Sequence, residues 1–308
     1  MPNWEDVLKE IQVKSAQYAS QAQGVLDEIR RTYLNELHLH TKRNIIAYYS
    51  GFLSKPGIAQ SAIIDEDKNG FMMAVHKLDR SKGLDLILHT PGGDLAATES
   101  IVDYLHKMFG HDIRAIVPQI AMSGGTMIAC SCKEIFMGAH SNLGPIDPQL
   151  RGIPAIGVIE EFKRAYEEIK KDAAKIDVWR PVLSKYMPTF ISQCETAIEW
   201  SKGFVTEQLA NVMFEGEPKS REKAEKIVGK LTDFSGNRAH NRHIHLDECK
   251  RMGLKVRAIE GNQKFQDLVL TVHHCYMHSL MNSAAHKIIE NHLGAALIKH
   301  QSQSTGNT

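Results

Sequence analysis

The chain has 308 residues, of which 43% are hydrophobic and 24% are charged, a composition that excludes a disordered chain. Its 37 basic and 36 acidic residues leave a formal charge of +1, which gives no whole-chain electrostatic reason to expect nucleic acid or an anionic membrane as a partner. The sequence contains no run of 18 apolar residues, so no membrane span is predicted, and residues 1–6 do not resemble the start of a signal peptide. The five cysteines form no CxxC pair, which favours reduced thiols, so we expect a soluble cytoplasmic protein.

The predicted elements begin with a helical arm over residues 1–40. Hydrophobic residues recur there near helical spacing among polar ones: Val7, Ile11, Tyr18, Val25, Ile29 and Leu34. A strand is expected over 44–49, followed by the turn-rich residues 50–57. We place the main domain at residues 41–258.

Residues 84–137 carry the clearest pattern of the chain. Short apolar strands are expected at 84–89, 113–118 and 134–137, with helices at about 97–109, ended by Gly110, and at 122–132. Strands joined by helices of this length predict a parallel sheet with right-handed crossovers. The fold class is therefore α/β.

Mostly helical segments are expected after residue 150. They cover 159–175, 189–200, 205–212 and 246–252, the last ended by Gly253. A helical tail is expected over 264–299, within a C-terminal region 259–308. Residues 301–308 read as a frayed end.

Two glycine-bearing loops follow the strands at 84–89 and 113–118. They are residues 90–94 (Thr-Pro-Gly-Gly-Asp) and 121–125 (Ala-Met-Ser-Gly-Gly), one crossover apart. In a parallel sheet both loops lie beyond the carboxyl ends of the strands, where functional groups gather. We therefore expect them to be neighbours, with Ser123 at the start of its helix.

Ser123 has a chemical and a plain structural interpretation. The amides of Gly93 and Gly124 would converge near its hydroxyl and form an oxyanion hole, in which each donor is worth about 3–4 kcal/mol in the transition state. Alternatively, Ser123 only caps the helix and the glycines only form turns. Two glycine pairs at one-crossover spacing beside a serine favour the chemical interpretation.

These loops resemble the oxyanion and nucleophile loops of the ClpP/crotonase superfamily, and Ser-Gly-Gly is the form seen in signal peptide peptidase A. The chain is most similar to the serine dehydrogenase proteinase family. That family shares the stretch matched by residues 143–149 (Leu-Gly-Pro-Ile-Asp-Pro-Gln), and a histidine, here His240, ahead of the segment 244–254. The resemblance covers about residues 40–256. It implies a ClpP/crotonase-type parallel-sheet spiral of βαβ units, to which the residue patterns outside this range add helices at both ends.

The resemblance also implies a serine endopeptidase that acts on peptide or protein substrates. Ser123 would be the nucleophile, Asp147 the carboxylate that orients the base, and His240 the general base. Gly92, Gly93 and Gly124 would form the oxyanion and substrate-binding loops. No cofactor and no metal are implied, and relatives that assemble into rings lead us to expect a homo-oligomer.

Other assignments of the base remain open at this stage. His243 stands where the family pattern leads us to expect a proline, so His243 and His240 compete for the role, and His140 is a weaker candidate. A serine–lysine dyad is disfavoured because Lys133 lies at the far end of the helix that Ser123 begins.

Alternative functions are a crotonase-like acyl-CoA enzyme without a serine nucleophile, or an inactive scaffold of the same fold. His274 and His278 have i, i+4 spacing, but no third metal ligand is evident, so we expect an ordinary surface helix there. The basic pairs at 30–31 and 42–43 are expected to be solvated helix ends rather than a nucleic-acid site.

Overall fold

The computed structural model describes residues 3–17, 22–233 and 242–301. Its centre is a seven-stranded sheet in the order β10-β5-β3-β2-β1-β11-β12. The parallel strands are β1 (Asn44–Ser50), β2 (Leu84–His89), β3 (Ile113–Val117), β5 (Glu134–Met137) and β10 (Val256–Ala258). At one edge, β11 (Ala285–Asn291) runs antiparallel to β1, and β12 (Ala296–His300) pairs with β11. The expected α/β fold with a largely parallel sheet is confirmed.

The central strands form where runs of apolar residues can be covered on both faces. Every residue of β1 and β2 is buried, as is usual for a parallel sheet between two helical layers. In β1, Ile46 and Tyr48 face one core, whereas Ile45 and Tyr49 face the other. Alternation along each strand therefore supplies two separate hydrophobic cores.

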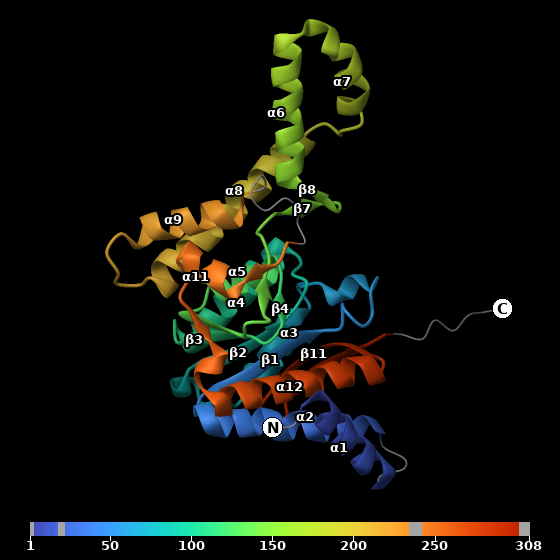
Figure 1. Cartoon of the computed structure of the whole chain (residues 1–308), viewed down its shortest axis with the longest axis vertical. Coiled ribbons are helices and arrows are strands. Elements are labelled where there is room, and N and C mark those ends of the chain that lie inside the picture. Colours follow the sequence, from blue (N-terminus) through green and yellow to red (C-terminus); the bar gives the residue numbers. More distant parts are fainter. Residues whose placement is uncertain (1–2, 18–21, 234–241, 302–308) are drawn as a thin grey trace, which may run out of the picture.

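Helices cover both faces of this sheet (Figure 1). The first core contains α3 (Asp67–Val75), α4 (Leu95–Phe109), α5 (Gly124–Cys130), α9 (Ser220–Leu231) and α11 (Leu246–Met252). The second core contains α2 (Ala22–Thr41) and α12 (Gln263–Asn282), and α1 (Trp4–Gln17) packs against both of these helices. Within the described residues, none of the helices has the length and apolarity needed to cross a membrane.

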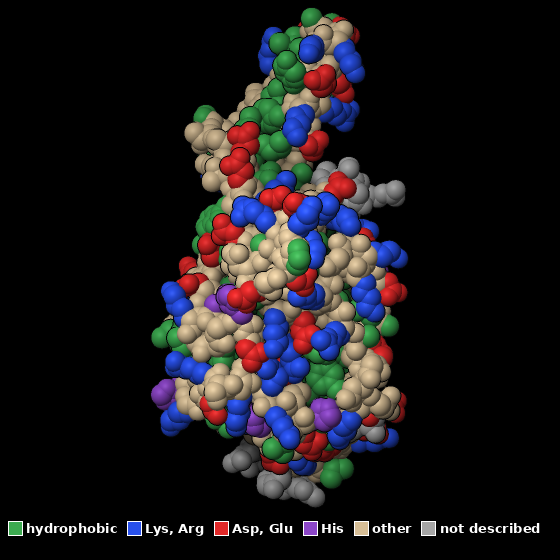
Figure 2. All heavy atoms as spheres, turned by 90° about the vertical axis from the view of Figure 1, so that its left-hand side faces the viewer, with side chains coloured by type: hydrophobic (Ala, Val, Ile, Leu, Met, Phe, Trp, Pro, Cys, Tyr) green, Lys and Arg blue, Asp and Glu red, His purple; other side chains and the backbone are tan. Residues whose placement is uncertain are grey.

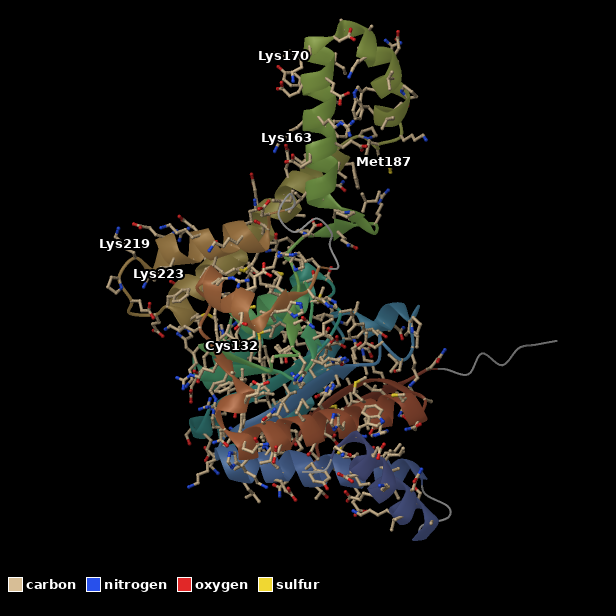
Figure 3. All side chains as sticks on the ribbon, viewed as in Figure 1. Cys132, Lys163, Lys170, Met187, Lys219 and Lys223 are labelled. Carbon is tan, nitrogen blue, oxygen red and sulfur yellow. The ribbon has the colours of Figure 1, made fainter. Side chains whose placement is uncertain are left out.

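An arm projects from this body (Figures 1 and 2). It consists of α6 (Ala155–Lys171), α7 (Ile176–Leu183) and the start of α8 (Phe190–Gln208), which continues as a π-helical turn, Leu209–Met213. A small core between α6 and α8 contains Val158 and Phe190. Lys163 and Lys170 point away from α7 (Figure 3). Over the face seen in Figure 2, Lys and Arg side chains are interspersed with Asp and Glu.

Short elements complete the edge of the sheet where the chemistry is expected. A three-stranded sheet joins β4 (Ile120–Ala121), β6 (Asn142–Leu143) and β9 (Ile244–His245), and β7 (Gln149–Leu150) pairs with β8 (Ile153–Pro154). Single 3₁₀ turns occur at Ala59–Ser61, Arg80–Lys82, Ala173–Lys175 and Ile259–Gly261.

Several predicted boundaries need correction. The predicted helix over 264–299 is wrong in its second half, because residues 285–291 and 296–300 are strands that extend the central sheet. The N-terminal region forms two helices rather than one, separated by residues outside the described range. The predictions at 84–89, 134–137 and 246–252 are confirmed to the residue.

The side chains expected at the surface also need correction. Arg30 is fully buried because it pairs with the buried Glu290 at 2.9 Å, and Arg43 is largely buried because it pairs with Asp85 at 2.8 Å. His273 and His278 of α12 are buried rather than solvated: the His273 ring packs against Tyr49 and His89 of the sheet, and the His278 ring packs against Trp4 of α1. No group of three or more metal-binding side chains occurs among the described residues.

Candidate active site

The two glycine loops lie side by side, as predicted. After β2 and β3 end, the two chains continue together: the Thr90 N–H donates to the Ile120 carbonyl at 3.2 Å, and the Met122 N–H donates to the Thr90 carbonyl at 3.0 Å. A Cβ atom built on Gly92 would lie 2.6 Å from the Met122 carbonyl oxygen and 2.8 Å from the Ser123 Cβ. Only glycine fits at position 92, where φ is +91°.

Ser123 sits on a strained turn between β4 and α5. Its φ of 48° and ψ of −111° lie outside the regions that a side chain with a Cβ prefers. Its hydroxyl makes no capping hydrogen bond to α5, so the simple N-cap interpretation is wrong. Strain of this kind costs about 1–3 kcal/mol and is concentrated at functional sites.

The backbone amides of Gly93 and Gly124 lie beside Ser123. Neither N–H donates a hydrogen bond to any other residue in the described ranges. A Cβ built on Gly124 would lie 3.3 Å from the Gly93 nitrogen, so the two glycines face each other. Because α5 begins at Gly124, the amide of this residue also stands at the positive end of a short helix.

A third segment, which no sequence motif predicted, pairs with the Gly93 loop. The Ile63 N–H donates to the Gly92 carbonyl at 2.8 Å, and the Asp94 N–H donates to the Ile63 carbonyl at 2.9 Å. A Cβ on Gly93 would come within 2.2 Å of the Ile63 nitrogen, so this pairing needs a glycine. The Asp94 carboxylate accepts from the Ala97 N–H at 2.8 Å and caps α4. The Asp94 side chain is therefore the N-cap of α4.

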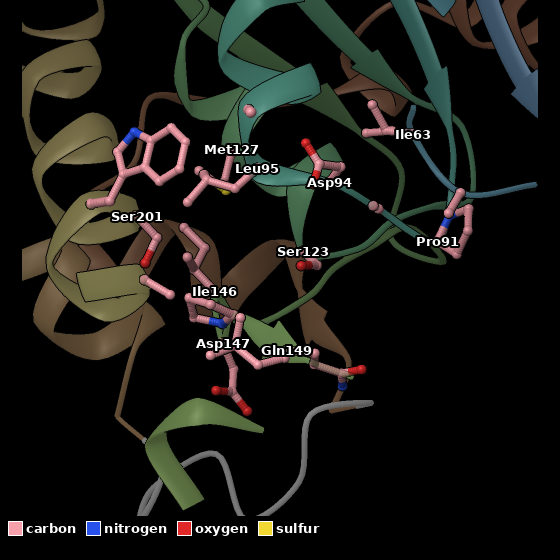
Figure 4. Close-up of a pocket in the computed structure, with 18 of the residues that line it drawn as sticks. Ile63, Pro91, Asp94, Leu95, Ser123, Met127, Ile146, Asp147, Gln149 and Ser201 are labelled. Carbon is pink, nitrogen blue, oxygen red and sulfur yellow. The ribbon is translucent and has the colours of Figure 1, made fainter. Parts of the chain in front are cut away.

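Asp147 lies on the opposite side of the same cleft. The Gly144 N–H donates to the Thr126 hydroxyl at 3.0 Å, and that hydroxyl lies 3.0 Å from the Ala121 carbonyl and 2.9 Å from the Gly144 carbonyl. Thr126 therefore ties α5 to the segment that leads to Asp147. The Asp147 side chain is 4% exposed, and this residue lines the cleft together with Ser123 (Figure 4).

The cleft has a volume of about 600 Å³ and is mostly apolar. Leu95, Met127, Ile146 and Trp200 form its walls, and Figure 4 shows Leu95, Met127 and Ile146 near Ser123. No lysine, arginine or histidine from the described residues lines it. Trp200 and the neighbouring Ser201 come from α8, far from the loops in sequence, and no motif pointed to them.

The predicted base, His240, lies outside the described residues, and both flanks of its segment are held at this site. The Ile146 N–H donates to the carbonyl of Leu231, at the end of α9, at 2.9 Å. After the segment, β9 pairs with β6 in the register Ile244 with Leu143. Leu231 and Ile244, which flank this segment in the sequence, thus both bond to the stretch that leads to Asp147.

The other candidate bases lie elsewhere or are exposed. The His140 ring contacts the Pro118 carbonyl at 2.9 Å and does not line the cleft. Lys133 pairs with Asp112, also away from the cleft, as expected. His243 is exposed and does not line the cleft either.

Comparison with known families agrees with this arrangement. The family described as ClpP-like SDH-type serine proteinase matches residues 19–287. The chain belongs to this family. The resemblance to serine dehydrogenase proteinases inferred from the loop motifs is therefore confirmed, and the matched range includes both loops, Asp147 and β9.

The names of the curated relatives of this chain carry no activity. Two uncharacterized proteins of Methanocaldococcus jannaschii are 34% and 30% identical to it over 191 residues, 62% of the chain. The chain spans 59% and 58% of their lengths. A structure of a mutant of the 1510-N membrane-bound stomatin-specific protease covers 64% of this chain and 92% of its own. At 19% identity and a TM-score of 0.26, it carries no argument here.

Proposed function

We propose that the protein is a serine peptidase in which Ser123 attacks the carbonyl of a peptide bond. The observation that carries the proposal is the strained Ser123 between two backbone amides, Gly93 and Gly124, that donate to no acceptor among the described residues. A tetrahedral oxyanion formed on attack would accept hydrogen bonds from both amides. Donors fixed before the reaction stabilise this charge without reorganisation, and each contributes about 3–4 kcal/mol.

A base is needed because a serine hydroxyl is a weak nucleophile at neutral pH. We propose that His240 takes the Ser123 proton and passes it to the leaving amine, and that Asp147 fixes the tautomer of the imidazole and stabilises its charged form. Asp147 lines the cleft with Ser123, and both flanks of the segment that carries His240 are attached beside Asp147. Water then hydrolyses the ester and frees Ser123. This mechanism needs no cofactor.

The walls of the cleft favour a peptide over the alternative acyl-CoA substrate. Coenzyme A carries several phosphate groups, which proteins bind with lysine, arginine or helix N-termini. The described wall of the cleft has no basic side chain, whereas Leu95, Met127 and Trp200 offer apolar surface to a substrate side chain. The second alternative, an inactive scaffold, would gain nothing from the strained turn at Ser123.

The setting is also part of the proposal. All five cysteines are free and buried, which supports a reducing compartment such as the cytoplasm. A homo-oligomer is supported by large apolar side chains left exposed on the arm, among them Tyr166 and Val178, at 64% and 69% exposure. We retain the division into an N-terminal arm, a main domain and a C-terminal region as a prediction.

Covalent labelling tests the proposal directly. A fluorophosphonate probe is expected to label the wild-type protein on Ser123, and Ser123→Ala is expected to lose both the label and peptide hydrolysis. Ser201→Ala is the matched control, since Ser201 lies in the same cleft but its hydroxyl donates to the Ile198 carbonyl at 3.0 Å. Labelling that survives Ser123→Ala, or a wild-type protein that hydrolyses peptides without being labelled, would contradict the proposal.

A further inference from the structure

A buried ion pair lies directly behind the Gly92–Gly93 loop. Lys287, on β11, and Asp67, at the start of α3, have fully buried side chains whose charged atoms are 2.8 Å apart. Lys299 of β12 also reaches Asp67, at 3.3 Å. The proposed reaction uses none of these groups, and a buried ion pair by itself adds little to stability. The groups to which the ion pair bonds therefore indicate its role.

The ion pair bonds to the segment around Ile63, which in turn pairs with the Gly92–Gly93 loop. The Lys287 ammonium donates to the Ala62 carbonyl at 2.6 Å, and the Asp67 carboxylate accepts from the Ile64 N–H at 3.1 Å. These contacts fall on the two neighbours of Ile63, whose own N–H and carbonyl pair with Gly92 and Asp94. The ion pair thus sets the position of Ile63, and Ile63 sets the position of the loop.

A second connection reaches the loop through Tyr48. Its phenol donates to the Asp67 carboxylate at 2.9 Å and interacts with the Thr90 hydroxyl, which in turn accepts from the Gly92 N–H at 3.1 Å. Burial raises the pKa of Tyr48 well above its ordinary value, so the phenol keeps its proton and remains a donor. Gly92 is therefore held at its carbonyl by Ile63 and at its amide through Thr90.

Because a peptide group is planar, a fixed Gly92 carbonyl also fixes the direction of the Gly93 N–H. The Gly92–Gly93 peptide is trans, as are all described peptide bonds, so the Gly93 N–H points opposite to the Gly92 carbonyl. Since that carbonyl is fixed on Ile63, the Gly93 N–H faces away from Ile63 and towards Gly124. A rotated peptide would turn a carbonyl towards the site in place of a donor.

We propose that Lys287 and Asp67 are positioning residues that keep the Gly92–Gly93 peptide in the orientation that presents the Gly93 N–H beside Ser123. The inference rests on the proposed function, because it assigns these residues to the oxyanion hole of that reaction. It predicts that loss of the pair lowers the rate of the chemical step and leaves substrate binding largely intact.

The test compares Lys287→Met and Asp67→Asn with Glu290→Gln. Glu290 is on the same strand and belongs to a similarly buried ion pair, with Arg30, on the face of the sheet that packs on α2. The two test variants are expected to lose about 10- to 100-fold in kcat, less than the 10²–10³-fold typical of complete loss of one oxyanion donor. Their KM should stay within about threefold. The rate of fluorophosphonate labelling and the affinity for a peptide boronate should fall with kcat.

A double variant separates positioning from stability. Asp67→Asn combined with Lys287→Met removes both buried charges, so it should be more stable than Lys287→Met alone, yet its kcat should remain low. A kcat loss no larger than that of Glu290→Gln, a rise in KM without a fall in kcat, or recovery of kcat in the double variant would overturn the inference. A wild-type protein that is not labelled at Ser123 refutes the proposed function itself, and the inference with it.

Discussion

Ser123 concentrates the chemistry at the scale of one residue. Among the described non-glycine residues with positive φ, Ser123 is the only one that is partly buried. The others are all exposed: Lys42, Lys77, Arg151, Thr189 and Lys219. The turn lifts the hydroxyl off the helix that a capping serine would bond to. A conformation that is costly for stability thus occurs at the residue that we propose as the nucleophile.

This cost can be measured by substitution at Ser123. Glycine adopts positive φ without a Cβ penalty, so Ser123→Gly is expected to be about 1 kcal/mol more stable than Ser123→Ala, and both should be inactive. Urea unfolding of the three proteins provides the measurement. Equal midpoints for the Gly and Ala variants would mean that the turn is not strained.

The same residue shows how far sequence reasoning reaches. The serine, its neighbouring glycines and their mutual approach were predictable, because glycine pairs after successive parallel strands have few other uses. The pairing of Ile63 with Gly92 and Asp94 was not predictable, because these contacts are made by backbone atoms of a segment with no regular pattern. Arg30 and Lys287 were also missed as buried residues, since burial of a charge depends on partners such as Glu290 and Asp67, which are distant in sequence.

At the scale of elements, the site is an assembly of short connections around a rigid sheet. β4 carries the chain to Ser123, β6 leads to Asp147, and β9 follows the segment that contains His240. These strands have two residues each, which is too short for periodicity to reveal. Pairing with neighbours, rather than intrinsic propensity, defines them.

This arrangement makes the choice between His240 and His243 testable. His243 directly precedes β9 and is exposed, whereas His240, the base that we propose, lies outside the described residues. We expect His240→Ala to reduce kcat by about 10³-fold or more, as loss of a catalytic histidine does, and His243→Ala to change it by less than about threefold. Peptide hydrolysis by the two variants decides the assignment, and the reverse ranking would give the role to His243.

At the scale of the whole molecule, the two halves of the chain interlock through the central sheet. A helical tail was predicted over 264–299, but its second half forms β11 and β12. Lys287 and Glu290 are nevertheless buried there, on a strand next to β1. An α/β class and most βαβ elements followed from local patterns, whereas the place of β11 and the arm of α6 and α7 depended on contacts between distant segments.

Buried histidines predict that the folded molecule is sensitive to acid. Burial lowers the pKa of His89 to about 3, among Tyr49, Phe52 and His273, and the pKa of His273 also lies well below its ordinary value. The unfolded chain binds protons at these residues below about pH 6.5, whereas the folded chain does not, so stability is complete above that pH and falls as the pH decreases towards 3. Each such histidine contributes about 1.4 kcal/mol per pH unit in this window.

The measurement is the free energy of unfolding in urea between pH 7 and pH 4.5. His89→Leu should show a shallower fall than the wild type, whereas a control at the exposed His76, His76→Gln, should follow the wild type. An unchanged slope in His89→Leu would show that His89 does not titrate with unfolding.

The position of β11 has a consequence for biosynthesis. Ribosomes release the chain from its N-terminus, so Ser123, Asp147 and both glycine loops emerge long before Lys287. Until β11 is synthesised, Asp67 lacks its buried partner Lys287. The contacts that position Ile63, and through Ile63 the Gly92 carbonyl, are then incomplete. If the proposed function holds, a nascent chain carries Ser123 before the Gly93 N–H is held beside it, so the proposed peptidase activity should begin only after β11 has been synthesised.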